Sequence, residues 1–353
     1  MAICIITGVG GLIGSEATRF FIKQGFSVVG IDNNMREQFF GPEASVQWNI
    51  DKLKHEYDER NFINFDIDIC DTSKINDLFE SFSDEIGIVI HTAAQPSHDW
   101  AVKSPLLDFQ VNAYGTLNLL EATKKYAPEA SFIFCSTNKV YGDNPNKLDL
   151  YEFDSRMDVS VLSKYYNGID ESMSIDNCIH SLFGCSKLSA DAYVQEYGKN
   201  FGMNTAVFRG GCLTGANHSS AELHGFLAYL VKCIVKGKKY TIFGRKGKTV
   251  RDNISSRDVI TAFWENCKSP HPGEVYNIGG CRENSVSMLE AIKMIEKIAN
   301  KKAIIEYSDK ARVGDHIWYI SNMDKFKGDY PNWVMHDKLY PLLSEMVEVA
   351  HKV

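Results

Sequence analysis

Three glycines near the start of the chain have the spacing of an anion-binding turn. Gly8, Gly11 and Gly14 follow the apolar segment 2–7 and open a segment with apolar residues at helical spacing. Residues without a Cβ allow a tight turn and the close approach of a pyrophosphate, and the N-terminus of the following helix offers N–H groups. Asp32 ends the next apolar segment, where a carboxylate can accept hydrogen bonds from both ribose hydroxyls and repels a 2′-phosphate. These residues predict the binding of a dinucleotide, NAD rather than NADP.

The first half of the chain has the alternating pattern that places such residues at one edge of a parallel sheet. Short apolar segments alternate with longer amphipathic segments, which is typical of a parallel sheet covered by helices on both faces. We therefore expect an α/β fold with a doubly wound parallel sheet, of the Rossmann type. The predicted strands are Ile3–Thr7, Ser27–Ile31, Asn61–Asp66, Ile88–His91, Ser131–Ser136 and Thr205–Arg209, and the predicted helices are Gly14–Gln24, Ser73–Phe82, Asp108–Tyr126, Leu182–Phe201 and Ser287–Ala299.

The pattern changes after about residue 210, where short segments rich in glycine, arginine and lysine replace the alternation. With 353 residues the chain exceeds what one hydrophobic core usually serves. We expect an NAD-binding domain over 1–210, which also receives residues of about 250–280. Residues 211–353 are expected to form mainly a smaller substrate-binding cap, with the ligand cleft between the two lobes.

Composition excludes several classes of function. The net charge of −7 argues against a general nucleic-acid or anionic-membrane binder. No apolar run approaches the roughly 18 residues of a membrane span. The nine cysteines are scattered and form no Cys-x-x-Cys pair, so neither a disulfide scaffold nor a metal site is expected, and a reducing cytoplasm fits this usage.

A second set of motifs lies in the middle and the C-terminal part of the chain. Residues 133–143 read Ile-Phe-Cys-Ser-Thr-Asn-Lys-Val-Tyr-Gly-Asp, and residues 180–187 read His-Ser-Leu-Phe-Gly-Cys-Ser-Lys. Together with Val-Arg-Asp at 250–252, Tyr-Asn-Ile-Gly-Gly at 276–280 and Arg-Val-Gly-Asp at 312–315, they resemble the extended short-chain dehydrogenase/reductase family. The chain is most similar to the CDP-paratose (CDP-tyvelose) 2-epimerases, over nearly its whole length. The resemblance implies an NAD-dependent nucleotide-sugar epimerase that oxidises a sugar carbon transiently and returns the hydride to the other face.

The same resemblance assigns expected roles to individual residues. In catalysis, Thr137 would bind the reacting sugar hydroxyl and Lys187 the nicotinamide ribose. The residues expected to bind NAD are Gly8, Gly11, Leu12, Ile13, Asp32, Asn33, Asp68, Ile69, Ala93, Ala94, Gln95, Asn112 and Lys187. Those expected to bind the nucleotide-diphosphate sugar are His98, Asn138, Lys139, Arg209, Arg251, Arg312 and Asp315.

One position departs from the family pattern of Tyr-x-x-x-Lys. Phe183 stands four residues before Lys187, and a phenyl ring cannot take the proton that the tyrosine hydroxyl normally accepts. Such acid–base groups typically supply about 10²–10⁴ in rate. Either Phe183 is an engineered substitution or another residue carries the proton. The candidates are Lys139, Tyr141, His98, Tyr165, Tyr166 and Cys185, with Lys139 favoured because a buried lysine beside another cation has a lowered pKa.

Alternative functions remain open at this point. Dehydration is disfavoured, because the family's sugar dehydratases place Asp-Glu directly after the threonine, where this chain has Asn138 and Lys139. A dehydrogenase or reductase that releases a keto product is the second reading, and a catalytically silent protein that binds NAD and a sugar nucleotide is the third. The helices expected near 108–126 and 182–201 commonly pair between two chains in this family, which predicts a homodimer or a larger homo-oligomer.

Overall fold

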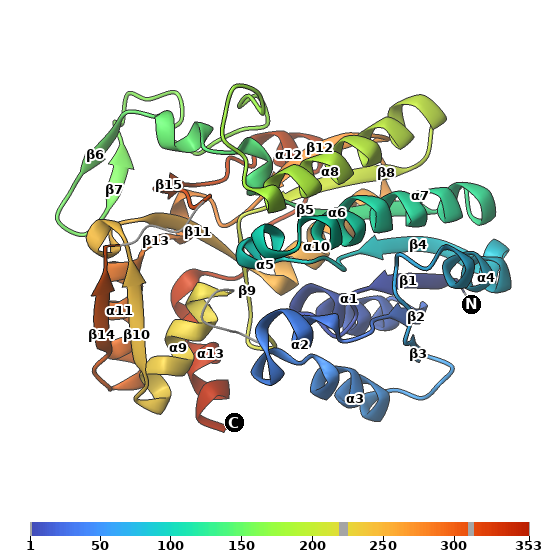
Figure 1. Cartoon of the computed structure of the whole chain (residues 1–353), viewed down its shortest axis with the longest axis horizontal. Coiled ribbons are helices and arrows are strands. Elements are labelled where there is room, and N and C mark those ends of the chain that lie inside the picture. Colours follow the sequence, from blue (N-terminus) through green and yellow to red (C-terminus); the bar gives the residue numbers. More distant parts are fainter. Residues whose placement is uncertain (1, 219–224, 310–313, 353) are drawn as a thin grey trace. The chain divides into compact units, whose positions relative to one another are not determined.

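The computed structural model of the chain describes residues 2–218, 225–309 and 314–352. The chain forms two compact units (Figure 1). Unit 1 consists of the described residues of 1–137, 182–209 and 259–276, and unit 2 of the described residues of 138–181, 210–258 and 277–353.

A seven-stranded sheet runs through unit 1. Short apolar segments form its strands because their side chains are buried on both faces, as at every position of the first strand. The strand order is β12-β8-β5-β4-β1-β2-β3, and the pairings from β5 to β3 are parallel. The strands are β1 Ile3–Thr7, β2 Ser27–Ile31, β3 Phe62–Phe65, β4 Ile86–His91, β5 Ser131–Thr137, β8 Thr205–Gly210 and β12 Glu274–Ile278.

Helices cover both faces of this sheet. The chain proceeds outward from β1 to β3 and then in the opposite direction from β4 to β8, so right-handed crossovers place the connecting helices on opposite faces. Trp264 packs edge-on against Phe21 at 5.8 Å between ring centroids, which joins two helices of one layer. The helices are α1 Leu12–Lys23, α2 Met35–Phe40, α3 Gln47–Glu56, α4 Thr72–Phe82, α5 His98–Lys103, α6 Pro105–Phe109, α7 Gly115–Tyr126, α8 Leu182–Phe201 and α10 Ser256–Lys268.

Unit 2 contains small sheets and a helical layer with its own core. β11 (Val250–Ser255) pairs with β9 (Cys212–Thr214), β13 (Ser285–Ser287) and β15 (Trp318–Tyr319). The other strand pairs are β6 (Leu150–Glu152) with β7 (Met157–Val159), and β10 (Lys239–Phe243) with β14 (Ile304–Ser308). The helices are α9 Phe226–Lys236, α11 Met288–Ala299, α12 Asp324–Asp329 and α13 Leu339–Lys352. Apolar side chains of α9, α11 and α13 form the core of this unit.

The predicted α/β fold with a doubly wound sheet is confirmed. Two predicted strands, Ile3–Thr7 and Ser27–Ile31, have the bounds of β1 and β2. The helix expected over 108–126 is helical from Pro105 onward but contains a π-helical turn at Gln110–Tyr114. Over the described part of the chain, no helix combines the length and apolar character needed to cross a membrane.

Candidate active site

The turn between β1 and α1 is closed by backbone contacts that leave no room for side chains. Gly8 has a φ of +70°, in the left-handed region, and a Cβ there would lie 2.8 Å from the backbone nitrogen of Ala93. A Cβ at Gly14 would lie 2.2 Å from the carbonyl oxygen of Gly8. Helix α1 begins at Leu12 after Gly11, and no described side chain caps its first turn. The N–H groups and the positive end of the helix dipole form a site for an anionic pyrophosphate.

Asp32 lies at the end of β2, beside this turn. Its Oδ2 accepts a hydrogen bond from the backbone nitrogen of Gly10 at 2.9 Å, and its Oδ1 accepts one from that of Asn34 at 2.8 Å. Desolvation raises the pKa of Asp32, although these two N–H groups oppose the rise. Desolvation lowers the pKa of nearby Arg36 to about 10, against the attraction of Asp32. A carboxylate at this point of the sheet can accept hydrogen bonds from a ribose diol.

The predicted adenine-binding residues follow β3, the neighbour of β2. The Oδ1 atom of Asp68 accepts a hydrogen bond from the backbone nitrogen of Cys70 at 2.9 Å. Ile69 is buried, and its carbonyl oxygen accepts a hydrogen bond from Asn118 Nδ2 at 2.8 Å. Asn33, directly after Asp32, accepts a hydrogen bond from the backbone nitrogen of Met35 at 3.2 Å. These predicted residues therefore lie at the same edge of the sheet as the glycine turn.

A buried polar network joins the loop after β4 to the helices beside it. The backbone nitrogen of Gln95 donates to Asn112 Oδ1 at 2.9 Å, and Gln95 Nε2 donates to Asp108 Oδ1 at 2.7 Å. Asn112 Nδ2 in turn donates to Ser186 Oγ at 3.0 Å. Gln95 and Asn112 were predicted from the sequence, whereas Asp108 and Ser186 were not. The signal for Asp108 was its position four residues before Asn112, on the same face of a helix.

The loop that contains this network also begins with two of the predicted cofactor-binding residues. The backbone nitrogen of Ala93 donates to Thr7 Oγ1 at 3.2 Å, which ties the loop to the end of β1. Ala93 and Ala94 are partly buried. The backbone of Ala93 lies next to Gly8, as expected of a segment beneath the cofactor phosphates.

Helix α8 presents Phe183 and Lys187 from one face, because they are four residues apart. Lys187 is buried, and its Nζ donates to the carbonyl oxygen of Cys135 at 2.9 Å. Desolvation lowers the pKa of Lys187 to about 8. The buried ring of Phe183 lies edge-on to the ring of His98, with 4.9 Å between centroids. Thr137 ends β5 two residues after Cys135, so these four predicted residues gather where β4 and β5 end.

Unit 2 brings together three residues predicted to bind the substrate. The guanidinium of Arg251 donates to Asp315 Oδ1, and Lys139 Nζ lies 3.7 Å from the same oxygen. Lys139 Nζ also donates to the carbonyl oxygen of Gly314 at 2.9 Å. Desolvation lowers the pKa of Lys139 to about 8. Desolvation opposes ionisation of Asp315, but Arg251 and Lys139 outweigh it and lower the pKa of that carboxyl. Asn138, next to Lys139, is buried.

Two residues that the sequence analysis singled out have other partners. Arg209 is buried and donates from both Nε and Nη2 to Asp191, at 3.0 and 2.9 Å. This internal ion pair occupies the guanidinium, so we leave Arg209 out of the proposed substrate site. The hydroxyl of Tyr141 bonds to Asn277 Oδ1 at 2.8 Å in the interior of unit 2. Arg312 lies outside the described residues.

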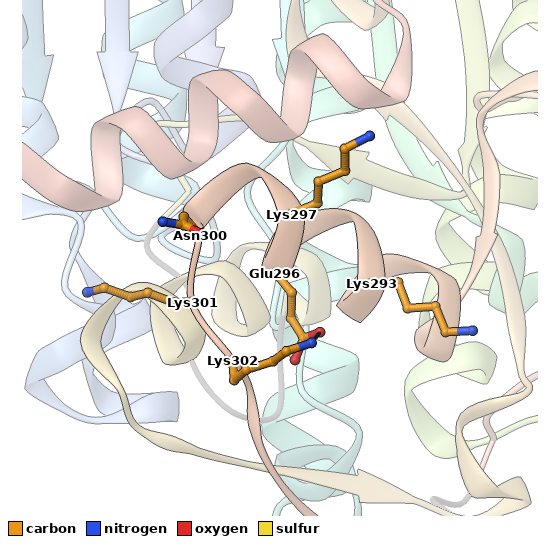
Figure 2. A pocket seen from close by; sticks show the side chains of 6 residues that line it. All are labelled: Lys293, Glu296, Lys297, Asn300, Lys301 and Lys302. Carbon is orange, nitrogen blue, oxygen red and sulfur yellow. Dashed lines mark hydrogen bonds and ion pairs between the residues drawn. The ribbon is translucent and has the colours of Figure 1, made fainter.

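A lysine-rich depression at the end of α11 contains none of the predicted site residues (Figure 2). Glu296 pairs with Lys302 at 2.9 Å, and Lys301 donates to the carbonyl oxygen of Val235 at 2.6 Å. The side chains of Lys293 and Lys297 point in different directions in Figure 2. The depression therefore has no converging set of cations and is not included in the candidate site.

Comparison with known proteins shows similarity along most of the chain. The NAD dependent epimerase/dehydratase family matches residues 4–279. CDP-paratose 2-epimerase of Salmonella typhi is 32% identical over 303 residues, which cover 84% of each chain. The dTDP-glucose 4,6-dehydratase of Escherichia coli is 26% identical over 348 residues, covering 94% of this chain and 88% of that one. The crystal structure of UDP-glucuronic acid 4-epimerase from Bacillus cereus, in complex with UDP-glucuronic acid and NAD, is 25% identical, covers 99% of each chain and has a TM-score of 0.77.

Proposed function

Since the chain belongs to the NAD dependent epimerase/dehydratase family, we propose that it is an NAD-dependent nucleotide-sugar epimerase. The family contains epimerases and dehydratases, and the pair of residues after Thr137 distinguishes between these two activities. Asn138 is buried and Lys139 is tied to Gly314 and Asp315, so no carboxylate stands where a sugar dehydratase needs Asp-Glu. The similarity to two epimerases supports the same choice.

The residues of unit 1 fit NAD. No described side chain caps the N-terminus of α1. The N-cap residue Gly11 has no side chain, so a pyrophosphate can approach the backbone closely. Asp32 would accept the ribose hydroxyls, and Asp68 and Ile69 would border the adenine. Bound NAD supplies a reversible acceptor for a hydride.

Two residues of unit 1 would prepare the sugar for oxidation. Thr137, at the end of β5, would hold the reacting hydroxyl in place with its own hydroxyl. Lys187 would donate to the nicotinamide ribose from its position on α8. Its buried cation would also stabilise negative charge that develops on the sugar oxygen, since such an interaction is strong in a poorly solvated site.

The charged cluster of unit 2 would bind the diphosphate of the substrate. Arg251 and Lys139 bring two cations to one carboxylate, that of Asp315, so the cluster keeps an excess of positive charge. A planar guanidinium suits phosphate oxygens, and a diphosphate can replace Asp315 as its partner. Arg312, outside the described residues, remains a predicted member of this site.

The function is tested by incubating the purified protein with CDP-, UDP-, GDP- and dTDP-sugars and analysing the products by NMR and mass spectrometry. An epimerase gives an isomer of unchanged mass without accumulation of NADH. Stoichiometric NADH would indicate a dehydrogenase, and loss of water from the sugar would indicate a dehydratase. Binding without turnover would indicate the silent binding protein. Lys187→Met, which removes the buried cation, should lose turnover while it keeps the fold.

We also propose a homodimer that forms through the helices next to the site. Large apolar side chains on α6 and α8 are exposed, among them Leu106 at 79%, Phe109 at 52%, Tyr193 at 41% and Phe201 at 53%. The two helices contact each other, and exposed large apolar side chains on neighbouring helices are typical of a protein–protein interface. A cytoplasmic location is proposed because the nine cysteines carry free thiols, which are typical of a reducing compartment.

A further inference from the structure

The residue that replaces the expected tyrosine touches a histidine. The ring of Phe183 lies 4.9 Å from the ring of His98 between centroids, at an interplanar angle of 60°. Phe183 is 7% exposed and His98 is partly buried, so the contact lies at the margin of the core rather than in bulk solvent. The para carbon of Phe183 has no hydroxyl, but the imidazole that contacts this ring can both accept and donate a proton.

Hydrogen bonds of the preceding loop hold His98 in contact with Phe183. His98 begins α5 directly after Ser97, whose hydroxyl caps the helix by accepting from the backbone nitrogen of Trp100. Gln95 anchors the same loop through its bond from Nε2 to the carbonyl oxygen of Ser97, at 2.9 Å. The imidazole is therefore presented by a capped helix start and not by a loose loop.

Phe183, the other member of the contact, is tied to the same network of hydrogen bonds. Ser186 Oγ donates to the carbonyl oxygen of Phe183 at 3.1 Å and accepts from Asn112 Nδ2. Asn112 is also bonded to the backbone nitrogen of Gln95. A continuous chain of hydrogen bonds thus links Gln95, in the loop before His98, to the backbone of Phe183.

We propose that His98 exchanges the proton of the sugar hydroxyl in place of the tyrosine that Phe183 replaces. This role rests on the proposed function. In the oxidising step the imidazole would take the hydroxyl proton as the carbon–oxygen double bond forms, and NAD, when bound, would supply the acceptor for the hydride of the same carbon. When the hydride is returned to the opposite face of the keto carbon, the imidazolium would give its proton back to the oxygen. Protons and electrons are conserved over the cycle.

The other titratable groups near α5 are less suited to this exchange. The elements packed against α5 include α6 and α8, and Trp100 of α5 also contacts Phe39 of α2. On α2, Glu37 accepts a hydrogen bond from Asn34 and the Arg36 guanidinium lies over the Phe40 ring. Asp108 on α6 accepts hydrogen bonds from Gln95 and Asn112. Cys185 on α8 is exposed, and desolvation raises the pKa of its thiol. Lys187 donates to the carbonyl oxygen of Cys135.

The remaining charged side chains near His98 have other partners or are exposed to solvent. Asp191 on α8 pairs with Arg209. On α5 itself, Asp99 is exposed, and the Lys103 ammonium lies 4.3 Å from the ring centroid of Trp100. Among the described groups compared above, His98 combines a side chain that can accept and donate a proton with contact to the Phe183 ring.

The test combines substitutions with NMR on the NAD-bound, full-length protein. His98→Gln should lower the epimerisation rate by about 10²–10⁴, the range for a lost acid–base group. It should also abolish the acid limb of the rate–pH profile, because the wild type loses activity as the imidazole becomes protonated. The double variant His98→Gln with Phe183→Tyr should recover activity, since a phenol then stands beside Lys187. His55→Gln, at an exposed position of α3, is the matched control and should leave rate and profile unchanged.

The NMR measurement is independent of turnover. The imidazole resonance that disappears in His98→Gln should shift in Phe183→Tyr, because the ring beside it changes, and should stay in place in His55→Gln. An unshifted resonance, or a His98→Gln variant with the wild-type rate and acid limb, would overturn the role of His98. A wild-type protein that epimerises none of the sugar nucleotides would instead overturn the proposed function, whatever the NMR result.

Discussion

Replacing Lys187 by Met should change how the stability of the protein depends on pH. Lys187 is 3% exposed, and desolvation lowers its pKa from 10.5 to about 8 in the folded protein. Between these two values the unfolded chain holds a proton that the folded protein has lost. The free energy of unfolding therefore rises with pH from about pH 8 to pH 10.5, because folding no longer has to bury a cation.

The magnitude follows from the same two values. A difference of about 2.5 pKa units at 1.36 kcal/mol each corresponds to at most about 3 kcal/mol. Met has no charge to bury, so Lys187→Met should be most favourable relative to the wild type at pH 7. This relative gain should shrink by up to about 3 kcal/mol by pH 10.5. Lys187→Met also loses the hydrogen bond from Nζ to the carbonyl oxygen of Cys135 and the contact of the ammonium with the Phe134 ring, at 4.0 Å from its centroid. These losses offset part of the gain.

The assay is urea unfolding of the NAD-free protein and its variant at several pH values from 7 to 10.5, followed by circular dichroism. The quantity to compare is the difference in unfolding free energy between the two proteins, since other titrating groups contribute to both. His91 stays neutral in this range, because burial and Lys187 lower its pKa below the ordinary value. Lys52→Met, at an exposed position, is the control. A difference between wild type and Lys187→Met that is constant over this range would refute the reasoning.

Three further outcomes are expected. Asp32→Ser should weaken NAD binding by about 1.5–3 kcal/mol, as for a lost charge-assisted hydrogen bond, and should strengthen NADP binding, because Arg36 remains while the carboxylate is gone. Calorimetry with both cofactors measures this, and equal affinity of the wild type for NAD and NADP would contradict it. Arg251→Ala should weaken sugar-nucleotide binding by about 1.5–3 kcal/mol and leave NAD binding unchanged; normal binding of the sugar nucleotide would exclude the cluster from the substrate site. Phe109→Glu should convert the proposed dimer to a monomer by light scattering, and a monomeric wild type at micromolar concentration would refute the interface.

Strands β1, β2, β4, β5 and β8 were predictable because burial on both faces makes each of them a short apolar run. Strand β3 is buried only at Phe62 but is also rich in apolar residues. Asn61–Asp66 was expected where β3 spans Phe62–Phe65, and Ser131–Ser136 where β5 spans Ser131–Thr137. Gly8, Asp32 and Asp66 end the runs of β1, β2 and β3. The residues predicted to bind the cofactor lie together at one edge of the sheet for the same reason, since they follow the strands directly.

Elements that depend on distant partners could not be predicted in this way. Helix α3 has little amphipathic pattern, and Asn49 fixes it to the glycine turn by donating from Nδ2 to the carbonyl oxygen of Gly10 at 2.9 Å. Strand β12 joins the sheet beside β8, far from it in sequence, so no local pattern assigns it. The same reason explains Arg209, because its pairing with Asp191 depends on how α8 packs and not on the residues around the arginine.

The missing tyrosine shows what a motif can and cannot indicate about a site. The relation of Phe183 to Lys187 follows from their spacing on one helix, so the loss of the hydroxyl was visible in the sequence. A search for its replacement along the motif favours Lys139, two residues after Thr137. The structure gives the Lys139 ammonium two partners within unit 2, Gly314 and Asp315. Because β4 and β5 are neighbours, the loop after β4 reaches α8, which packs against β5, and His98 meets the ring of Phe183 there. A group that replaces a catalytic side chain is therefore better sought on the adjacent strand's loop than on the adjacent residues of the motif.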